Sequence, residues 1–267
     1  MEIQLWRKRL APYELAVNEI VTKFNHLIYE RHLEGKYSPM QRVEGRVKSI
    51  SSIIEKMQMK NVNINDLETE ILDLAGVRII CQFEEDIFRV KNAIGKRTDM
   101  KVIKEKDYVN IMKNSGYRSF HLIVEYEVNT VDGPKKLPVE IQIRTLAMDF
   151  WATVEHSLNY KYRGHIPEFV QDKLINASNA IIVLDREMAA VRDEILDAQN
   201  YNIVKENLVS DILINLQNLY KVASRREVLR IQSEFYQVFE ENDIEKLAHF
   251  ARQLDKIAEG HGAQSLS

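Results

Sequence analysis

The feature that most limits the possible folds is a change in the period of the apolar residues between about residues 64 and 145. Three segments within this span alternate apolar and polar residues, at 77–83, 119–128 and 137–144. A period of two with many β-branched residues is typical of strands that bury one face. The sequence on both sides has the helical period instead. The chain is therefore expected to adopt an α+β fold with a central sheet.

The last two of these strands are expected to form an antiparallel hairpin. The run Asp132–Pro134 lies between them, and an Asp-Gly pair is a strong signal for a tight turn. A helix over 85–94 and a weaker strand near 100–104 are expected between the first strand and the hairpin. The hairpin strands are neighbours in the sequence, whereas the strand at 77–83 is far from them, so the sheet is expected to contain both local and distant strand pairs.

Helical periodicity precedes the sheet. Residues 10–34 are expected to form one helix, and Ser38 followed by Pro39 is typical of a helix start. Apolar residues spaced 4-3-4-3 after this start predict a single helix over 39–60 with one buried stripe. The stripe consists of Val43, Val47, Ile50, Ile54 and Met57.

Helical periodicity also follows the sheet, beginning at Leu146. A break near Gly164–Pro167 precedes a long helix that is expected to end at about Asn200. At least two more amphipathic helices are expected within 201–258, and residues from Gly260 onward are expected to be a frayed tail.

This pattern predicts two domains. Residues 1–200 form the first, and residues 201–267 form a helical C-terminal extension. Asn242-Asp243 is expected to be the turn and cap between the last two helices. The extension is interpreted as an oligomerisation or packing element, and the alternative is a module that docks a partner.

Composition excludes several classes of protein. The net charge is −3, so strong binding to nucleic acid would need a local cluster of the 37 Lys and Arg residues. No apolar run approaches the roughly 20 residues that a membrane span requires. The single cysteine, Cys81, excludes an intrachain disulfide and a cysteine-based zinc site. A reducing, cytoplasmic location is therefore expected.

Polar side chains share one face of the expected hairpin. Glu140, Gln142 and Arg144 alternate along one strand, and His121 lies on the neighbouring strand. For an arbitrary strand this pattern indicates a solvated surface. Here the run Gly116–Arg118 places an aromatic side chain at the strand entrance, which favours a binding site.

Other residues near these strands suit a phosphate-bearing ligand and a metal ion. Arg46, Lys48 and Lys56 of the expected 39–60 helix can neutralise phosphates. Asp73 and Glu140 supply the oxygen ligands that Mg²⁺ accepts beside substrate phosphates. Arg78 and Tyr117 offer flat surfaces on which bases can stack. The combination predicts a magnesium-dependent nucleotide site.

Several sequence runs resemble the synthetase domain of the RelA/SpoT-type alarmone synthetases. The matching runs are Asp73–Ile79, Gly116–His121, Glu140–Thr145 and Met148–Ala152, followed by Glu155-His156. The similarity spans about residues 10–195 and is close to the small, single-domain bacterial synthetases. It implies a nucleotidyltransferase-like fold, in which a mixed β-sheet is flanked by helices.

The resemblance also implies an activity. Members of this family transfer the β,γ-pyrophosphate of ATP to the 3′-hydroxyl of GDP or GTP, which gives AMP and the alarmones ppGpp or pppGpp. The chain is then expected to be a GTP pyrophosphokinase of the stringent response that uses Mg²⁺ and forms a homotetramer. A nucleotide- or RNA-binding regulator with weak catalysis is the alternative, and another nucleotidyltransferase is a third reading.

Each residue that matches a family motif receives an expected role from the resemblance. Glu140 is expected to help hold Mg²⁺ and to activate the acceptor hydroxyl, with Asp73 as its partner in metal binding. The residues expected to bind ATP are Arg46, Lys48, Ser52, Lys56 and Arg78. The residues expected to bind the acceptor are Lys113, Asn114, Tyr117, His121, Gln142 and Arg144.

One missing motif and three substituted positions further narrow the expected activity. None of the seven histidines is followed by aspartate, so the His-Asp hydrolase motif of the long relatives is missing and a synthetase-only enzyme is expected. Asn25, Arg42 and Glu44 differ from the residues that the product-activated subgroup favours. A carboxylate at Glu44 would repel a polyphosphate, which argues against product activation.

Overall fold

The computed structural model describes residues 2–161 and 167–262, which form two compact units divided between Ala189 and Ala190. The helix break expected near Gly164 falls largely outside the described residues, as does the tail expected after Gly260. Each unit has its own apolar core.

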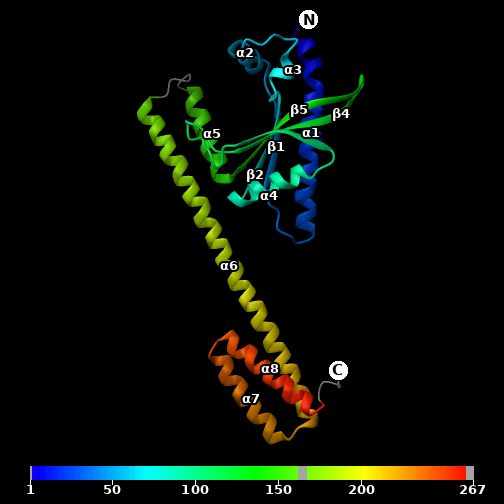
Figure 1. Ribbon diagram of the computed structural model, residues 1–267, viewed down its shortest axis with the longest axis vertical. Helices are drawn as coiled ribbons and strands as arrows, with labels where there is room; N and C mark the ends of the chain where they lie inside the picture. Colours follow the sequence, from blue (N-terminus) through cyan, green and yellow to red (C-terminus); the bar gives the residue numbers. More distant parts are fainter. Residues whose placement is uncertain (1, 162–166, 263–267) are drawn as a thin grey trace. The chain divides into compact units, whose positions relative to one another are not determined.

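The first unit is built on a five-stranded mixed sheet with the order β1-β2-β5-β4-β3. Figure 1 shows this sheet with helix α1 beside it. The strands β2 and β5 pair in parallel, and the other neighbours pair antiparallel. The β4–β5 hairpin turns where the Asp-Gly signal predicted it, so the hairpin and the mixed sheet are confirmed. The strands are β1 (Arg42–Val47), β2 (Ala75–Cys81), β3 (Met100–Asp107), β4 (Phe120–Thr130) and β5 (Gly133–Thr145).

Helices cover this sheet. Helix α1 packs against β1, β2, β4 and β5, and it buries Tyr13, Ile20 and Phe24 in the main core. The helices of this unit are α1 (Glu2–Leu33), α2 (Ile50–Lys60), α3 (Leu67–Glu70), α4 (Glu84–Gly95) and α5 (Leu146–Lys161), together with the first part of α6 (Glu168–Val222). The fold class predicted from the sequence is therefore confirmed.

The single helix expected over 39–60 is wrong. The first part of that segment is strand β1, and α2 begins only at Ile50, with Ser49 as its N-cap. Gly45 lies so close to α1 that a Cβ atom there would come within 2.4 Å of the Val17 side chain. The apolar residues of β1 and α2 together have the 4-3 spacing of a continuous helix, which led to the wrong prediction. Gly45, which is unfavourable inside a helix, was the contrary signal.

The second unit contains the later part of α6, α7 (Arg225–Glu240) and α8 (Ile244–Gly260). Helix α6 continues to Val222, so the end expected near Asn200 is wrong. The apolar helical period persists through Ile212, Leu216 and Leu219, which are buried in the core of this unit. Continued burial of one face explains why the helix does not end earlier.

The turn between the last two helices agrees with the sequence. Asn242 has a positive φ of 53°, and the Asp243 side chain accepts hydrogen bonds from the backbone N–H groups of Glu245 and Lys246. This confirms the expected turn and cap. Throughout residues 2–161 and 167–262, every helix is too short or too polar to traverse a lipid bilayer.

Candidate active site

The register of the sheet brings polar side chains from four strands onto one face. Residues paired directly across neighbouring strands point to the same side of a sheet. Two adjacent rows of paired residues therefore combine positions that are far apart in the sequence. One row contains Glu44, Arg78, Gln142 and His121, and the next contains Arg46, Gly76 and Glu140.

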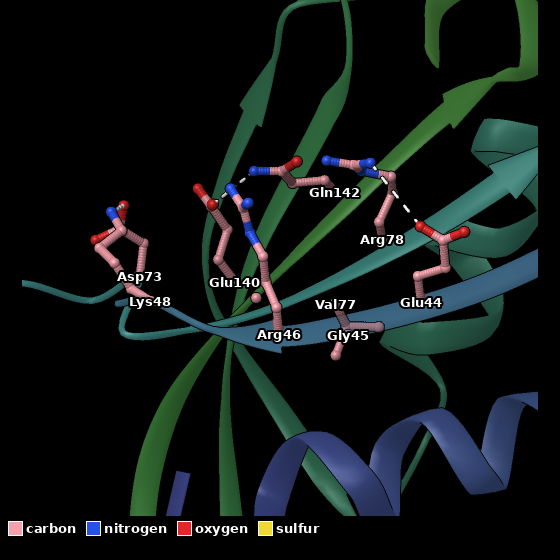
Figure 2. Close-up of a pocket in the computed structure, with 10 residues that line it drawn as sticks. Glu44, Gly45, Arg46, Lys48, Asp73, Val77, Arg78, Glu140 and Gln142 are labelled. Atoms are coloured by element: carbon pink, nitrogen blue, oxygen red, sulfur yellow. Dashed lines mark hydrogen bonds and ion pairs between the residues drawn. The ribbon is translucent and has the colours of Figure 1, made fainter. Parts of the chain in front are cut away.

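These rows form much of the lining of a cleft of 390 Å³ (Figure 2). In Figure 2, Glu140 lies between the Asp73–Lys48 pair and the side chains of Gln142 and Arg78. The lining therefore places carboxylates beside several cations. The lining residues are Glu44, Gly45, Arg46, Lys48, Asp73, Gly76, Val77, Arg78, Glu140 and Gln142.

Asp73 is held by two lysines just before β2. Its Oδ2 accepts hydrogen bonds from Lys48 Nζ, at 2.7 Å, and from Lys56 Nζ. Burial alone would raise the pKa of the Asp73 carboxyl, but the hydrogen bonds and charges of the two lysines outweigh it and hold this pKa below its ordinary value. Asp73 is therefore ionised at neutral pH.

Glu140 is held by groups from its own strand and from β4. Its Oε1 lies 3.0 Å from His121 Nδ1, and its Oε2 accepts a hydrogen bond of 2.8 Å from Gln142 Nε2. Burial would raise the pKa of Glu140, but these contacts lower it below its ordinary value, while the nearby charge of Asp73 acts in the opposite direction. The two carboxylates are thus close enough to influence each other.

A second group of side chains surrounds Tyr117. Its hydroxyl lies 2.9 Å from His121 Nε2, and burial raises the pKa of this hydroxyl. Lys113 Nζ is 4.7 Å from the centre of the Tyr117 ring and 4.6 Å from that of Tyr108. The guanidinium of Arg144 is 5.9 Å from the Tyr117 ring and donates to Gln142 Oε1 at 2.9 Å.

The structure brings together most, but not all, of the residues expected at the site. Six of the expected residues line the cleft: Arg46, Lys48, Asp73, Arg78, Glu140 and Gln142. Five more do not line it but are joined to it by side-chain contacts: Lys56, Lys113, Tyr117, His121 and Arg144. Ser52 and Asn114 do not line the cleft, and among the described residues no hydrogen bond or ion pair joins them to its lining. The Ser52 hydroxyl and backbone N–H both bond to the N-cap residue Ser49, while Asn114 is exposed in the turn that precedes Tyr117. Lys56 reaches the site through its contact with Asp73.

The two carboxylates fit a magnesium ion. Asp73 Oδ1 is buried and has no hydrogen-bond partner among the described residues, so it remains available to a cation. Mg²⁺ commonly takes only one or two carboxylates and fills its other positions with water and substrate phosphates. In the described part of the chain, no cluster of three or more His, Cys, Asp or Glu residues could hold a metal ion. A two-carboxylate site is therefore the arrangement that the residues offer.

Sequence reasoning missed one acidic residue of this region. Asp149, in the first turn of α5, contacts the guanidinium groups of Arg42, Arg78 and Arg144. It lies within a run that matches the alarmone synthetases, but no local pattern indicates a contact with three different strands.

Comparisons with known proteins give a consistent result. Residues 45–165 match the family model described as the region found in RelA / SpoT proteins. The chain is 47% identical to the GTP pyrophosphokinase YjbM of Bacillus subtilis, over 74% of this chain and 94% of that protein. It is 38% identical to the GTP pyrophosphokinase YwaC of the same organism, over 71% of this chain and 91% of that protein.

Solved structures agree. The crystal structure of small alarmone synthetase 1 from Bacillus subtilis bound to its product pppGpp superposes with a TM-score of 0.69 at 47% identity, and the match covers 72% of this chain and 98% of that chain. The same protein bound to AMPCPP gives a TM-score of 0.64 at 44% identity, with 73% and 99% covered. Sequence, fold and coverage together show that the chain belongs to the RelA/SpoT family and, within it, to the small alarmone synthetases.

Proposed function

We propose that this protein is a GTP pyrophosphokinase, which transfers the β,γ-pyrophosphate of ATP to the 3′-hydroxyl of GDP or GTP. The observation that carries the proposal is the placement of Asp73 and Glu140 beside several cations in one cleft, with Glu140 linked through His121 to Tyr117. A binding protein without catalysis gains nothing from two ionised carboxylates beside phosphates.

The donor side binds ATP. Arg46, Lys48 and Lys56 contact its phosphates, and Arg46 and Arg78 hold its adenine. Without nucleotide, the two lysines neutralise Asp73. When the triphosphate enters, they exchange this carboxylate for phosphate oxygens, which frees Asp73 Oδ2. Ser52 contributes from the first turn of α2.

The acceptor side binds the guanine nucleotide. Tyr117 stacks on the base, and its neighbours bind the phosphates and ribose. These neighbours are Lys113, Asn114, His121, Gln142 and Arg144.

Glu140 performs the proton transfer. Its pKa is lowered, so it is ionised at neutral pH and can accept the proton of the acceptor 3′-hydroxyl. A positioned base of this kind typically contributes ~10²–10⁴-fold to the rate. When bound by Asp73 and Glu140, Mg²⁺ supplies positive charge that polarises the phosphoryl group under attack. His121 and Gln142 hold the Glu140 carboxylate in place.

We also propose that the enzyme acts in the cytoplasm as a homo-oligomer, as the resemblance implies for a tetramer. Exposed apolar side chains on α6 in the second unit support self-association. They are Val191, Ile195, Leu196, Ile203 and Val204. Light scattering on the purified protein tests this, and a monomer at micromolar concentration contradicts it.

A product assay tests the proposed reaction. The protein is incubated with ATP, Mg²⁺ and either GDP, GTP or GMP, and the nucleotides are separated by ion exchange. We expect equal amounts of AMP and of a guanosine nucleotide with a 3′-pyrophosphate. Release of ADP or free pyrophosphate instead identifies another transferase, and nucleotide or RNA binding without turnover identifies a binding regulator. Added pppGpp should not raise the rate, because Glu44 repels it.

A further inference from the structure

Asp149 occupies an unusual position for an acidic residue. It lies in the first turn of α5 and is only 8% exposed, so solvent screens its charge weakly. It is not needed to cap the helix, because the Thr145 hydroxyl already accepts the backbone N–H of Met148 at 3.1 Å. The carboxylate is thus available for another purpose.

Three guanidinium groups converge on this carboxylate from three different strands. Asp149 Oδ2 lies 3.2 Å from Arg42 Nη2, while Asp149 Oδ1 lies 3.4 Å from Arg78 Nη1 and 3.5 Å from Arg144 Nε. The strands are β1, β2 and β5, respectively. One oxygen atom of Asp149 is therefore shared between Arg78 and Arg144.

These two arginines serve different nucleotides under the proposed function. Arg78 lines the cleft with Arg46 and the donor-side lysine Lys48. Arg144 lies instead over the Tyr117 ring and bonds to Gln142, which places it on the acceptor side. Asp149 is outside the lining of the cleft and contacts one arginine from each side.

The charges show why a shared anion matters. Burial of Arg144, and the nearby charges of Arg78 and Arg46, hold the pKa of Arg144 below its ordinary value, while Tyr117 and Asp149 act in the opposite direction. Without Asp149, the guanidinium groups would repel one another in a partly buried space. Arg78 and Arg144 would then move apart.

The pairing is also incomplete in hydrogen bonds. Arg78 Nε, Arg144 Nε and Asp149 Oδ1 are buried without a hydrogen-bond partner among the described residues. Asp149 Oδ2 accepts a hydrogen bond from Arg42 Nη2, but charge attraction alone holds Arg78 and Arg144 near Oδ1. The guanidinium groups can rotate to meet a ligand while they remain near the same anion.

We propose that Asp149 is a positioning residue, which orients Arg78 and Arg144 together and so prepares the donor and acceptor pockets at the same time. This inference rests on the proposed function for the identity of the two nucleotides. It predicts that loss of one carboxylate weakens binding on both sides of the cleft, although Asp149 touches neither nucleotide.

Calorimetry with the full-length protein tests the proposal without turnover. The probes are α,β-methylene ATP, a non-hydrolysable ATP analogue, and GDP, each titrated separately with Mg²⁺. We expect Asp149→Asn to weaken the binding of both by roughly ten-fold, about 1.4 kcal/mol, because Arg78 and Arg144 lose the anion that they share. An unchanged dissociation constant for either nucleotide overturns the proposal.

Glu44 offers a matched control. Its carboxylate lies 2.9 Å from Arg42 and 4.0 Å from Arg78, and among the described residues no contact with Arg144 is found. Glu44→Gln should therefore alter the binding of the ATP analogue alone. Equal losses for both nucleotides in Glu44→Gln would show that any charge change in the cleft has this effect, and would overturn the specific role of Asp149.

A conservative variant separates positioning from folding. Asp149→Glu keeps the charge, so we expect it to recover part of the affinity for both nucleotides. If Asp149→Glu melts like the parent protein and binds both as weakly as Asp149→Asn, the charge is not responsible and the proposal fails. If the parent protein binds both nucleotides but makes no AMP, the proposed function is refuted. The proposal for Asp149 is still tested in that case, because it depends only on the binding constants of the variants.

Discussion

The two units of this protein bury different kinds of side chain. In the first, polar and charged residues are buried beside the apolar core, whereas in the described part of the second every buried residue is apolar. The buried polar residues are Ser38, Asp86, Ser119, His121, Arg144, Thr145, Asp149, Ser178 and Asp185. Burying such groups costs free energy unless partners compensate them. The buried polar groups thus lie in the unit that contains the candidate site, and the core of the second unit is apolar.

The largest expected effect comes from removing one carboxylate of the first unit. Glu140→Gln should lower the turnover by at least about 10²-fold, because the acceptor hydroxyl loses its base. The amide keeps nearly the same shape, so we expect the fold to persist. AMP release measured under saturating nucleotide provides the test.

The matched control for this variant is Glu125→Gln on the same hairpin. Glu125 pairs with Lys136 at 3.4 Å, away from the cleft, and its loss should leave turnover unchanged. AMP release by Glu140→Gln at the parental rate would remove Glu140 from the catalytic role.

A core substitution in the second unit should lower the stability of that unit and leave turnover unchanged. Leu219 is fully buried, and Leu219→Ala should destabilise this unit by about 2–5 kcal/mol. Both tryptophans, Trp6 and Trp151, belong to the first unit. Denaturation followed by tryptophan fluorescence should therefore be unchanged, while circular dichroism should show an earlier loss of helix.

The rate of AMP formation per mole of enzyme should be the same in Leu219→Ala as in the parent protein. If the denaturation midpoints from fluorescence and from circular dichroism fall by the same amount, the two units unfold together. Their stabilities are then not independent.

The buried carboxylate of Asp185 should make the first unit sensitive to pH. Burial raises the pKa of Asp185 to about 6, and the charge of Glu84 adds to this, while a hydrogen bond from Thr145 opposes it. Because this pKa exceeds the unfolded value near 4, the folded protein binds more protons between pH 4 and pH 6. The contribution of Asp185 to stability therefore falls as the pH rises through that range.

Asp185→Asn removes this contribution. As the pH rises from 4.5 to 7, the stability of the variant's first unit relative to the parent should increase by about 2 kcal/mol, measured by urea denaturation with tryptophan fluorescence. Asp73 and Glu140 act with the opposite sign in both proteins, since their lowered pKa values cost stability only as the pH falls. A constant difference between parent and variant across this range would contradict the assignment.

The smallest effect is expected at a helix cap of the second unit. Asp243→Ala removes the side chain that accepts two backbone N–H groups of α8, and should cost about 1 kcal/mol. Circular dichroism during urea denaturation measures it. Ser224→Ala, at the N-cap of α7, should give a change of similar size. A loss of turnover in either variant would mean that the second unit influences the cleft.

Local sequence signals predicted the parts of the fold that depend on local structure. Alternation identified β2, β4 and β5, the Asp-Gly turn located the hairpin, and Asp243 identified the start of α8. Helix-like spacing misassigned β1, because a short strand that contains Gly45 was followed by a helix whose apolar residues continued the same pattern. The end of α6 was missed because neither a glycine nor a proline marks it.

The candidate site depended on distant pairings, which local patterns do not contain. The parallel pairing of β2 with β5 sets Gly76 opposite Glu140 and so brings Asp73 near that carboxylate. The family resemblance indicated these residues without explaining their proximity. The contacts of Asp149 could not be predicted, because they join a helix start to three strands.

The strand order β1-β2-β5-β4-β3 places the last strand to be synthesised at the centre of the sheet. Until β5 emerges from the ribosome, the β1–β2 and β3–β4 pairs have no partner between them, and each leaves an open edge that can pair with another chain. A nascent polypeptide that stops before Gly133 therefore lacks both the central strand of the sheet and Glu140. We therefore expect a chain truncated before Gly133 to be inactive and to expose strand edges that favour aggregation.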